Sequence, residues 1–166
     1  VELRTMDGHV FHPHGGAEMP AAFRTISEFG LLASAPEPFD PMERAFHALA
    51  SEQLPEGSPQ HPHWKLAHAY GLRPDLLAVT HIWQPDGERE DYVVAAKGAP
   101  EAIAGLCRLG AADRAALTQS IDAMASDGLR VLGVARATHA GPNWPDTPRE
   151  LTFEFMGLVG LADPLR

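Results

Sequence analysis

The stretch Tyr92-Val93-Val94-Ala95-Ala96-Lys97-Gly98-Ala99-Pro100-Glu101 combines the pattern of a strand with the start of a helix. Val93, Ala95 and Lys97 share one face of the expected strand, because side chains alternate along a strand. Pro100 suits the first position of a helix, where the amides have no partner within the helix. Small Ala95 and bare Gly98 are expected to leave an open floor beside the lysine, where a flat ring or a phosphate can approach the backbone. A plain strand-turn-helix with a solvated lysine is the alternative.

The neighbouring segments place this strand in a sheet. Residues 76–83 and 92–96 have strand patterns, and the connection Gln84-Pro85-Asp86-Gly87 is typical of a hairpin. Strands joined by a short hairpin pair in antiparallel fashion. The pattern therefore favours an α+β fold over a doubly wound parallel sheet.

Further elements follow from periodicity and capping. Residues 20–32 are expected to form a helix with Ala22, Ile26 and Phe29 on one face. Asp40-Pro41-Met42-Glu43 is a good helix start, with Asp as the cap and Glu completing a capping box. The remaining expected elements are a helix over 100–106, a helix over 113–127 with Leu117, Ile121 and Met124 on one face, and strands over 129–137 and 151–161.

Composition limits the classes of function. The 166 residues fit one domain, and 45% hydrophobic with 21% charged residues is ordinary for a globular protein. No apolar stretch is long enough to span a bilayer. The net charge of −9 argues against nucleic acid and anionic membrane surfaces as partners. The single cysteine, Cys107, excludes an internal disulfide and is interpreted as a small core residue at a helix end.

Nine histidines raise the possibility of a metal site. His12-Pro13-His14 and His61-Pro62-His63 could each present two imidazoles to Zn²⁺. A closed site needs about four ligands, and neither pair has a second cluster nearby in the sequence. Exposed loop histidines are therefore favoured, and no metal ligand is predicted.

Four segments together resemble the nucleotide-binding (N) domain of P-type cation-transporting ATPases. Lys97-Gly98-Ala99-Pro100-Glu101 is similar to the family's K-G-A-P-E signature. Residues 40–46 resemble its D-P-x-E-x-A-hydrophobic segment, and residues 128–132 resemble its G-x-R-V-L segment. Residues 155–166 resemble the strand and D-P-x-R hinge that return to the phosphorylation domain. The four lie in the family's order, and the resemblance implies a twisted antiparallel sheet flanked by helices on both sides.

The resemblance also implies roles for single residues. Lys97 would lie near the adenine end of the nucleotide, with Gly98 as the floor under the ring. Glu43 would accept a hydrogen bond from the adenine amino group, unless its carboxylate is engaged in the capping box. Arg130 would reach the phosphates, unless it is a solvated strand-end charge. The implied nucleotide-binding residues are Glu43, Leu72, Lys97, Gly98, Ala99, Arg130 and Leu132, the last packing near the sugar or base.

Two positions depart from the family pattern. Leu72 stands where the resemblance places a phenylalanine that stacks on adenine, and Leu77 stands where it places a lysine. Loss of a base–aromatic stack costs on the order of 1–3 kcal/mol. The sequence therefore predicts weak nucleotide binding with reduced selectivity for adenine.

The function implied by the resemblance is to hold ATP, with Mg²⁺ in the parent protein, for transfer of a phosphoryl group to an aspartate on a separate domain. Residues 1–166 would form one nucleotide-binding domain, excised from a larger membrane pump, with a hinge at Asp163, Pro164 and Arg166. It would be a cytoplasmic domain without catalytic residues, inactive alone, off the membrane surface, and a partner of the parent's phosphorylation and actuator domains. Two alternatives stay open: a degenerate domain acting as a regulatory or interaction module, and a histidine-rich metal sensor.

Overall fold

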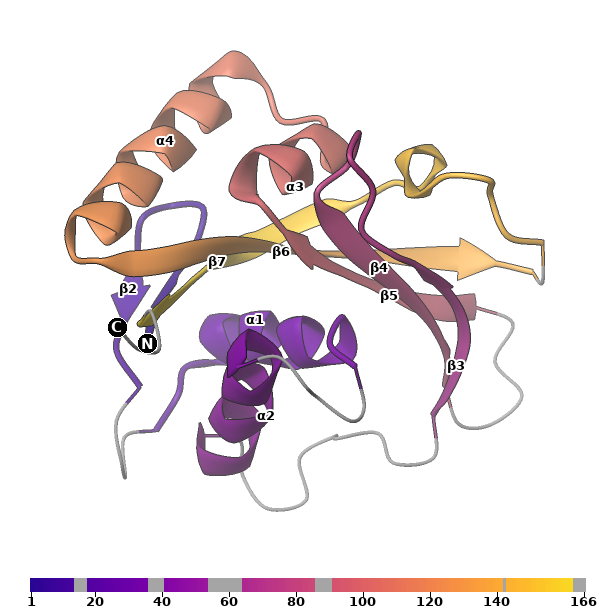
Figure 1. The fold of residues 1–166 in the computed structure, drawn as a ribbon, viewed down its shortest axis with the longest axis horizontal. Coiled ribbons are helices and arrows are strands. Elements are labelled where there is room, and N and C mark those ends of the chain that lie inside the picture. Colours follow the sequence, from indigo (N-terminus) through magenta and orange to yellow (C-terminus); the bar gives the residue numbers. More distant parts are fainter. Residues whose placement is uncertain (14–17, 36–40, 54–63, 86–90, 142, 163–166) are drawn as a thin grey trace.

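Seven strands of the described residues form one antiparallel sheet in the order β2-β1-β7-β6-β5-β4-β3 (Figure 1). The structure is a computed structural model that describes residues 1–13, 18–35, 41–53, 64–85, 91–141 and 143–162. The strands are β1 (Glu2–Arg4), β2 (Val10–Phe11), β3 (Lys65–Tyr70), β4 (Ala78–Gln84), β5 (Asp91–Gly98), β6 (Leu129–Ala140) and β7 (Glu154–Ala162).

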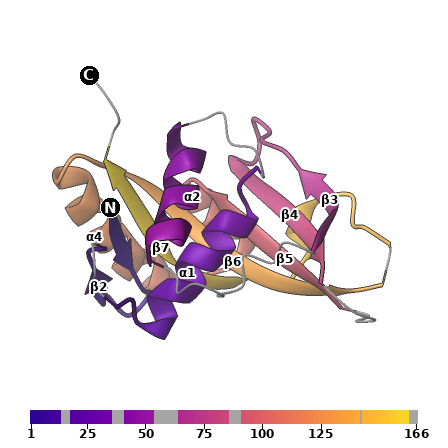
Figure 2. The same cartoon turned by 90° about the horizontal axis from the view of Figure 1, so that it is seen from below.

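Helices cover both faces of this sheet. Helices α1 and α2 lie on one face, and α3 and α4 lie on the other, as Figures 1 and 2 show from two directions. The prediction of an α+β fold with a twisted antiparallel sheet flanked on both sides is therefore confirmed. The helices are α1 (Ala21–Leu32), α2 (Pro41–Gln53), α3 (Pro100–Leu106) and α4 (Ala111–Ser126), with a short 3-10 helix at Pro148–Glu150. No helix in the described ranges is both long and apolar enough to cross a bilayer.

The centre of the sheet was predictable from the sequence, and the ends of its strands were less so. Strand β4 begins at Ala78 instead of residue 76, because the backbone of Leu76 closes a local turn with Arg73. Strand β7 begins at Glu154 instead of residue 151, because the amide of Leu151 bonds to the preceding 3-10 helix. Strands β1, β2 and β3 were not predicted.

The buried face of α1 differs from the predicted one. Ile26 is fully buried and Phe29 is partly buried, as expected, but Ala22 is exposed and Phe23 takes its place. In α4, Leu117 and Met124 are buried and Ile121 packs against the same core, as the periodicity predicted. The buried stripe of α1 contains Gly30 as well as Phe23 and Ile26. A glycine has no apolar side chain, so the periodicity of apolar residues does not reveal this stripe.

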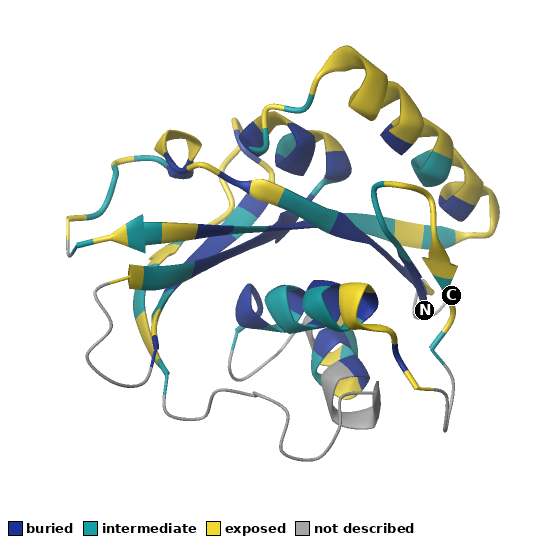
Figure 3. Cartoon of the chain, turned by 180° about the vertical axis from the view of Figure 1, so that it is seen from behind, coloured by how far each residue is buried: buried dark blue, intermediate teal, exposed yellow. Residues whose placement is uncertain are grey.

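Two hydrophobic layers hold the sheet between its helices, and Figure 3 shows buried residues in the strands and in the helices on both sides of them. One layer joins α3 and α4 to the sheet, and the other joins α1 and α2 to it. Val134 and Val159 point to the α1/α2 layer, whereas Ala135 and Leu158 point to the α3/α4 layer. Side chains thus alternate between the two faces along β6. In β7 the alternation is interrupted at Gly157, because Met156 packs in the α1/α2 layer and Leu158 packs in the α3/α4 layer.

Candidate functional site

Lys97 lies near the end of β5 on the α1/α2 face of the sheet. It pairs with Val79 of β4 on one side and with Val134 of β6 on the other. Side chains of paired residues point to the same face of a sheet. Because Val134 belongs to the core under α1 and α2, Lys97 also points to that layer, together with Val93 and Ala95, as predicted.

The side chain of Lys97 is buried, with 7% exposure, so the alternative of a solvated lysine is wrong. Its Nζ donates a hydrogen bond to Ser34 Oγ at 2.6 Å. The same Nζ lies 4.8 Å from the centre of the Phe46 ring, a distance that permits cation–π attraction. A buried ammonium is stable only with such partners. Sequence reasoning found Lys97 and missed both contacts.

The expectation of an open floor beside Lys97 is wrong at Ala95. Ala95 is fully buried, and Leu32 and Ala33 at the end of α1 pack in its cluster. A small side chain in a central strand lets the helix end come close, and this leaves no open surface above it. The small residue here serves helix–sheet packing.

Gly98 is buried as well, and the neighbouring strand fills the space beside it. A Cβ at this position would lie 2.6 Å from Cα of Ala78, and the carbonyl of Leu77 is close by. Gly98 therefore has a structural role in the close approach of β4, and its predicted role under an adenine ring remains a prediction. Ala99, which is half-buried, precedes α3 as its N-cap residue.

Leu132 and Arg130 lie on the same face as Lys97. They precede Val134 along β6 by two and four residues, with no irregularity in the pairing between 129 and 134. At about 3.4 Å per residue, Arg130 stands roughly 14 Å along the strand from Val134. Leu132 packs against the α1/α2 core, and Arg130 is exposed. Lys97, Leu132 and Arg130 thus lie in that order on one face of the sheet.

Glu43 lies in the first turn of α2, which covers this same face. The structure describes its backbone and leaves its side chain outside the description. Glu43 precedes Phe46 by three residues, and residues three apart lie on the same side of a helix. Since Phe46 contacts Lys97, the position of Glu43 is on the side of α2 that faces the sheet. Asp40 of the predicted capping box lies outside the described residues.

Leu72 and Leu77 are among the exposed large hydrophobic residues, with 67% and 55% exposure. Leu77 comes directly before β4, and its carbonyl accepts a hydrogen bond from the amide of Ala99 at 2.9 Å. Leu72 borders a depression of about 220 Å³, which Tyr70 and Arg149 also line. Neither leucine is held by a packed core, so both positions accept larger or charged side chains.

A groove of about 560 Å³ lies beside α3, and its lining includes Leu77 and Ala99, which flank Gly98. Leu77, Ala99, Glu101, Arg108 and Arg149 are among its lining residues, whereas Lys97, Leu132 and Arg130 are not. Its two arginines are engaged: Arg149 donates to the carbonyl of Asp75 at 2.7 Å, and Arg108 donates to the carbonyl of Arg149 at 3.3 Å. The Lys97 face, by contrast, holds a buried cation together with the motif residues Leu132 and Arg130.

The histidine and hinge predictions fall largely outside the described residues. His14, His61 and His63 lie there, as do Asp163, Pro164 and Arg166. The side chain of His12 is 64% exposed and lies 2.9 Å from a carboxylate oxygen of Glu2. In the described part of the chain, no three His, Cys, Asp or Glu side chains are grouped as metal ligands would be.

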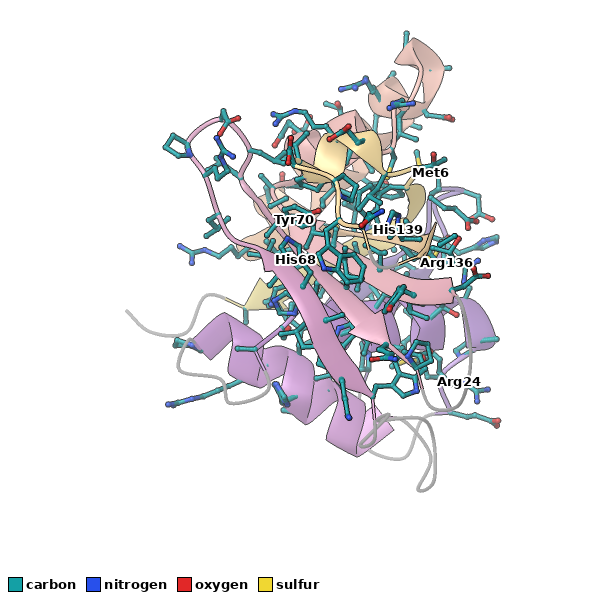
Figure 4. All side chains as sticks on the ribbon, turned by 90° about the vertical axis from the view of Figure 1, so that its right-hand side faces the viewer. Met6, Arg24, His68, Tyr70, Arg136 and His139 are labelled. Atoms are coloured by element: carbon teal, nitrogen blue, oxygen red, sulfur yellow. The ribbon has the colours of Figure 1, made fainter. Side chains whose placement is uncertain are left out.

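An aromatic cluster around Trp144 was not predicted. His68 and Tyr92 contact the Trp144 ring, with ring centres 5.8 and 4.8 Å away, and His139 lies 5.7 Å from it. Figure 4 shows His68, Tyr70 and His139 at this end of the sheet. The cluster joins residues from three strands and a loop, and it closes the edge of the α3 core.

Cys107 ends α3 as expected for a small residue packed against the core. Burial, with a smaller contribution from the carboxylate of Glu154, raises the pKa of the Cys107 thiol to about 12. The reactive species of cysteine is the thiolate. A thiol with this pKa stays protonated at neutral pH, so Cys107 is no nucleophile.

Comparison with known proteins agrees with this fold. The fold of the described residues defines a domain of the α+β class, with one antiparallel sheet between two pairs of helices. A family model described as P-type ATPase, cytoplasmic domain N, matches residues 78–166, which is more than half of the chain. The chain therefore belongs to the P-type ATPase family, and the matched region is its cytoplasmic N domain.

A curated relative points the same way. The chain is 34% identical over 91 residues to the sodium/potassium exporting P-type ATPase cta3 of Schizosaccharomyces pombe. The match covers 49% of this chain and 9% of that protein. The chain thus spans only a small part of the length of this relative. The family membership does not favour the interaction-module or metal-sensor alternatives.

Proposed function

We propose that this chain binds ATP on the face of its sheet that carries Lys97, Leu132 and Arg130. The observation that carries the proposal is the buried ammonium of Lys97 between β5 and α2, in a chain whose net charge is −9. Burying a cation costs desolvation free energy. In a protein with a negative net charge, such a cation attracts anions only at short range. Its place in the Lys-Gly-Ala-Pro-Glu motif of a P-type ATPase N domain supports a nucleotide as the ligand.

The order of residues along β6 gives the proposed orientation. The base lies near Lys97, with Leu132 against the base or sugar, and the phosphates extend toward Arg130. Glu43 of α2 accepts a hydrogen bond from the adenine amino group, and Gly98 and Ala99 line the adenine end. The roughly 14 Å between the Val134 and Arg130 positions suits an extended nucleotide more than a compact anion.

The described residues of this face do not fit a resident Mg²⁺ ion. Mg²⁺ prefers oxygen ligands from carboxylates and phosphates, whereas the described side chains of Lys97, Arg130 and Leu132 present an ammonium, a guanidinium and an isobutyl group. Any Mg²⁺ used by the parent protein is therefore not held by the side chains of Lys97, Arg130 and Leu132.

In a parent P-type ATPase, this domain contributes catalysis by positioning. It holds ATP so that the γ-phosphate reaches an aspartate on a separate phosphorylation domain, and closure about residues 163–166 brings the two together. The actuator domain is a further partner, and the domain lies on the cytoplasmic side of the membrane. We expect the 166-residue chain alone to bind ATP without turning it over.

The test is a titration of the isotope-labelled chain with ATP and, separately, with GTP, followed by NMR at single residues. We expect ATP to shift the amide signals of Lys97, Gly98 and Leu132, and GTP to shift them less. Lys97→Ala and Arg130→Ala are each expected to weaken ATP binding. Arg114→Ala is the matched control, because Arg114 is an exposed arginine on α4, on the opposite face.

Shifts confined to the groove beside α3, or unchanged affinity in both Lys97→Ala and Arg130→Ala, would contradict this function. Zinc is titrated in parallel. Zinc-induced shifts at His12 without any response to ATP would favour the metal-sensor alternative instead.

A further inference from the structure

We infer that Ser34 is a positioning residue of the nucleotide site, because it holds the ammonium of Lys97 in place from the end of α1. The inference rests on the proposed function and adds a residue to it. Ser34 lies 63 residues before Lys97 in the chain and outside the four segments that resemble the family. The two side chains meet because the end of α1 packs on β5.

The direction of the Ser34 hydrogen bonds is fixed. A serine hydroxyl has one hydrogen to donate and two lone pairs to accept with. Ser34 Oγ donates to the carbonyl of Gly30 at 2.8 Å, and a carbonyl can only accept. The hydroxyl hydrogen is therefore used within α1, and a lone pair of Oγ faces Lys97 Nζ at 2.6 Å. An ammonium has three donors, so Ser34 holds Lys97 while taking one of them.

The segment that carries Ser34 is fixed to the rest of the domain. The carbonyl of Leu32 accepts hydrogen bonds from the Trp83 indole at 2.7 Å, and His81 Nδ1 lies 3.0 Å from it. His47 Nε2 of α2 lies 2.8 Å from the carbonyl of Ala35. Strand β4 thus holds the last residue of α1, and helix α2 holds the residue that follows Ser34. Ser34 itself is buried, with 1% exposure.

Phe46 supports Lys97 from the second helix. Its ring is buried with 1% exposure, and Lys97 Nζ lies 4.8 Å from the ring centre. A Cβ at Gly30 would lie 2.7 Å from Cδ1 of this ring, so the glycine makes room for it. The hydroxyl of Ser34 and the face of Phe46 therefore fix a long, flexible side chain from two directions.

Fixing Lys97 before the nucleotide arrives should strengthen binding. Ordering a flexible side chain on binding costs about 0.5–1.5 kcal/mol, which corresponds to a two- to tenfold change in affinity. If the protein has already ordered Lys97, this cost is not part of the binding step. Loss of the Ser34 hydroxyl should then weaken ATP binding without removing any group that touches the nucleotide.

The experiment is a double-mutant cycle on the 166-residue chain, with ATP affinity measured by calorimetric titration. Ser34→Ala is expected to weaken ATP binding about two- to tenfold. In the Lys97→Ala background, the same change is expected to have no further effect, because Ser34 acts through the ammonium. An equal loss in both backgrounds, or unchanged affinity in Ser34→Ala, would overturn the inference.

Ser27→Ala is the matched control. Ser27 is also a fully buried serine of α1, and its Oγ also donates to a carbonyl four residues earlier, that of Phe23, at 3.1 Å. Its hydroxyl bonds to Phe23 and Met19, not to Lys97, so the change should leave ATP affinity unchanged. If Ser34→Ala does not fold, Ser34→Cys keeps a similar volume with a weaker acceptor, and the same loss is expected.

A second measurement separates the inference from the proposed function. The four proteins of the cycle are the unsubstituted chain, Ser34→Ala, Lys97→Ala and the double variant. Their thermal unfolding without nucleotide should give shifts in Tm that are not additive, because Ser34 and Lys97 are in contact. If the unsubstituted chain binds no ATP, the proposed function fails. Additive Tm shifts in that case would also show that Ser34 does not hold Lys97.

Discussion

The carbonyl oxygen of Leu77 stands on the side of Gly98 where any other residue carries its Cβ, and it accepts a hydrogen bond from the amide of Ala99 at 2.9 Å. One backbone group of Leu77 thus joins the start of β4 to the turn between β5 and α3. The side chain of the same residue is exposed, and its position is where the family resemblance places a lysine. Leu77 therefore combines a fixed backbone with a replaceable side chain.

Substitution of Gly98 tests this close approach. Gly98→Ala places a methyl group against Leu77 and Ala78, and we expect a loss of about 1–3 kcal/mol in the free energy of unfolding. Denaturant unfolding measures it. Gly105→Ala is the control, because a Cβ there meets nothing within 4 Å and Gly105 lies in α3. That change should be neutral or stabilising by up to about 1 kcal/mol. Equal stability of Gly98→Ala and the unsubstituted chain would refute the close approach.

Gly30 of α1 and Phe46 of α2 pack closely against each other, and a second prediction follows from this contact. Gly30→Ala should push the Phe46 ring and destabilise the fold by about 1–3 kcal/mol. Phe46→Leu removes the part of the ring that the new methyl meets, so the double variant should be more stable than the sum of the single effects predicts. Chemical denaturation of the four proteins checks this. Additive effects would mean that Gly30 and Phe46 do not constrain each other.

Restoring the family residues at the two exposed leucines should strengthen nucleotide binding. Leu72→Phe can add a base–aromatic stack, worth on the order of 1–3 kcal/mol, or about five- to a hundredfold in ATP affinity. Leu77→Lys adds a cation and is expected to increase affinity further. Stability should change by less than about 0.5 kcal/mol, since both side chains are exposed.

Leu66→Phe controls for this gain. Leu66 is another exposed leucine, on β3, with 41% exposure. The same aromatic exchange there should leave ATP affinity unchanged in a parallel titration. An equal gain at Leu66 would indicate nonspecific stacking, and no gain at Leu72 would place the base elsewhere.

The carboxylate of Glu2, in β1, is expected to make the stability of the fold depend on pH. Burial raises the pKa of Glu2, but hydrogen bonds and charges from Arg4 and His12 outweigh it, so the pKa lies below its ordinary value of 4.5. A carboxyl group with a lowered pKa stabilises the fold above about pH 4.5, and this stabilisation is lost as the pH falls through the folded-state pKa. Glu2→Gln should therefore lower stability at pH 7 and weaken its dependence on acid pH.

Thermal unfolding between pH 3 and pH 7 measures this effect. Glu154→Gln is the control, because Glu154 is 64% exposed and its ion pair with Arg136 is of the surface type that contributes little. If Glu2→Gln lost stability at acid pH as the unsubstituted chain does, the ionised Glu2 carboxylate would not stabilise the fold.

Much of the domain could be predicted because its signals are local. The strand before Lys97, the helix from Pro100 and the helix containing Leu117 and Met124 depend on alternation, a proline and a period of 3.6 residues. These patterns act within a dozen residues, so the sequence carries them directly. The short strands β1 and β2, with three and two residues, are too brief to show any period.

The sequence by itself determined the α+β class, the order of the central elements and the family to which the motif of Lys97 points. Only the tertiary structure decided that Lys97 is buried, that Ala95 lies under the end of α1, and that Ser34 and Phe46 meet the ammonium. The physical reason is that a strand pattern fixes which face a side chain takes, whereas its neighbours on that face come from distant parts of the chain. Those neighbours are set by how closely small residues such as Gly30 and Ala95 let the helices approach the sheet and one another.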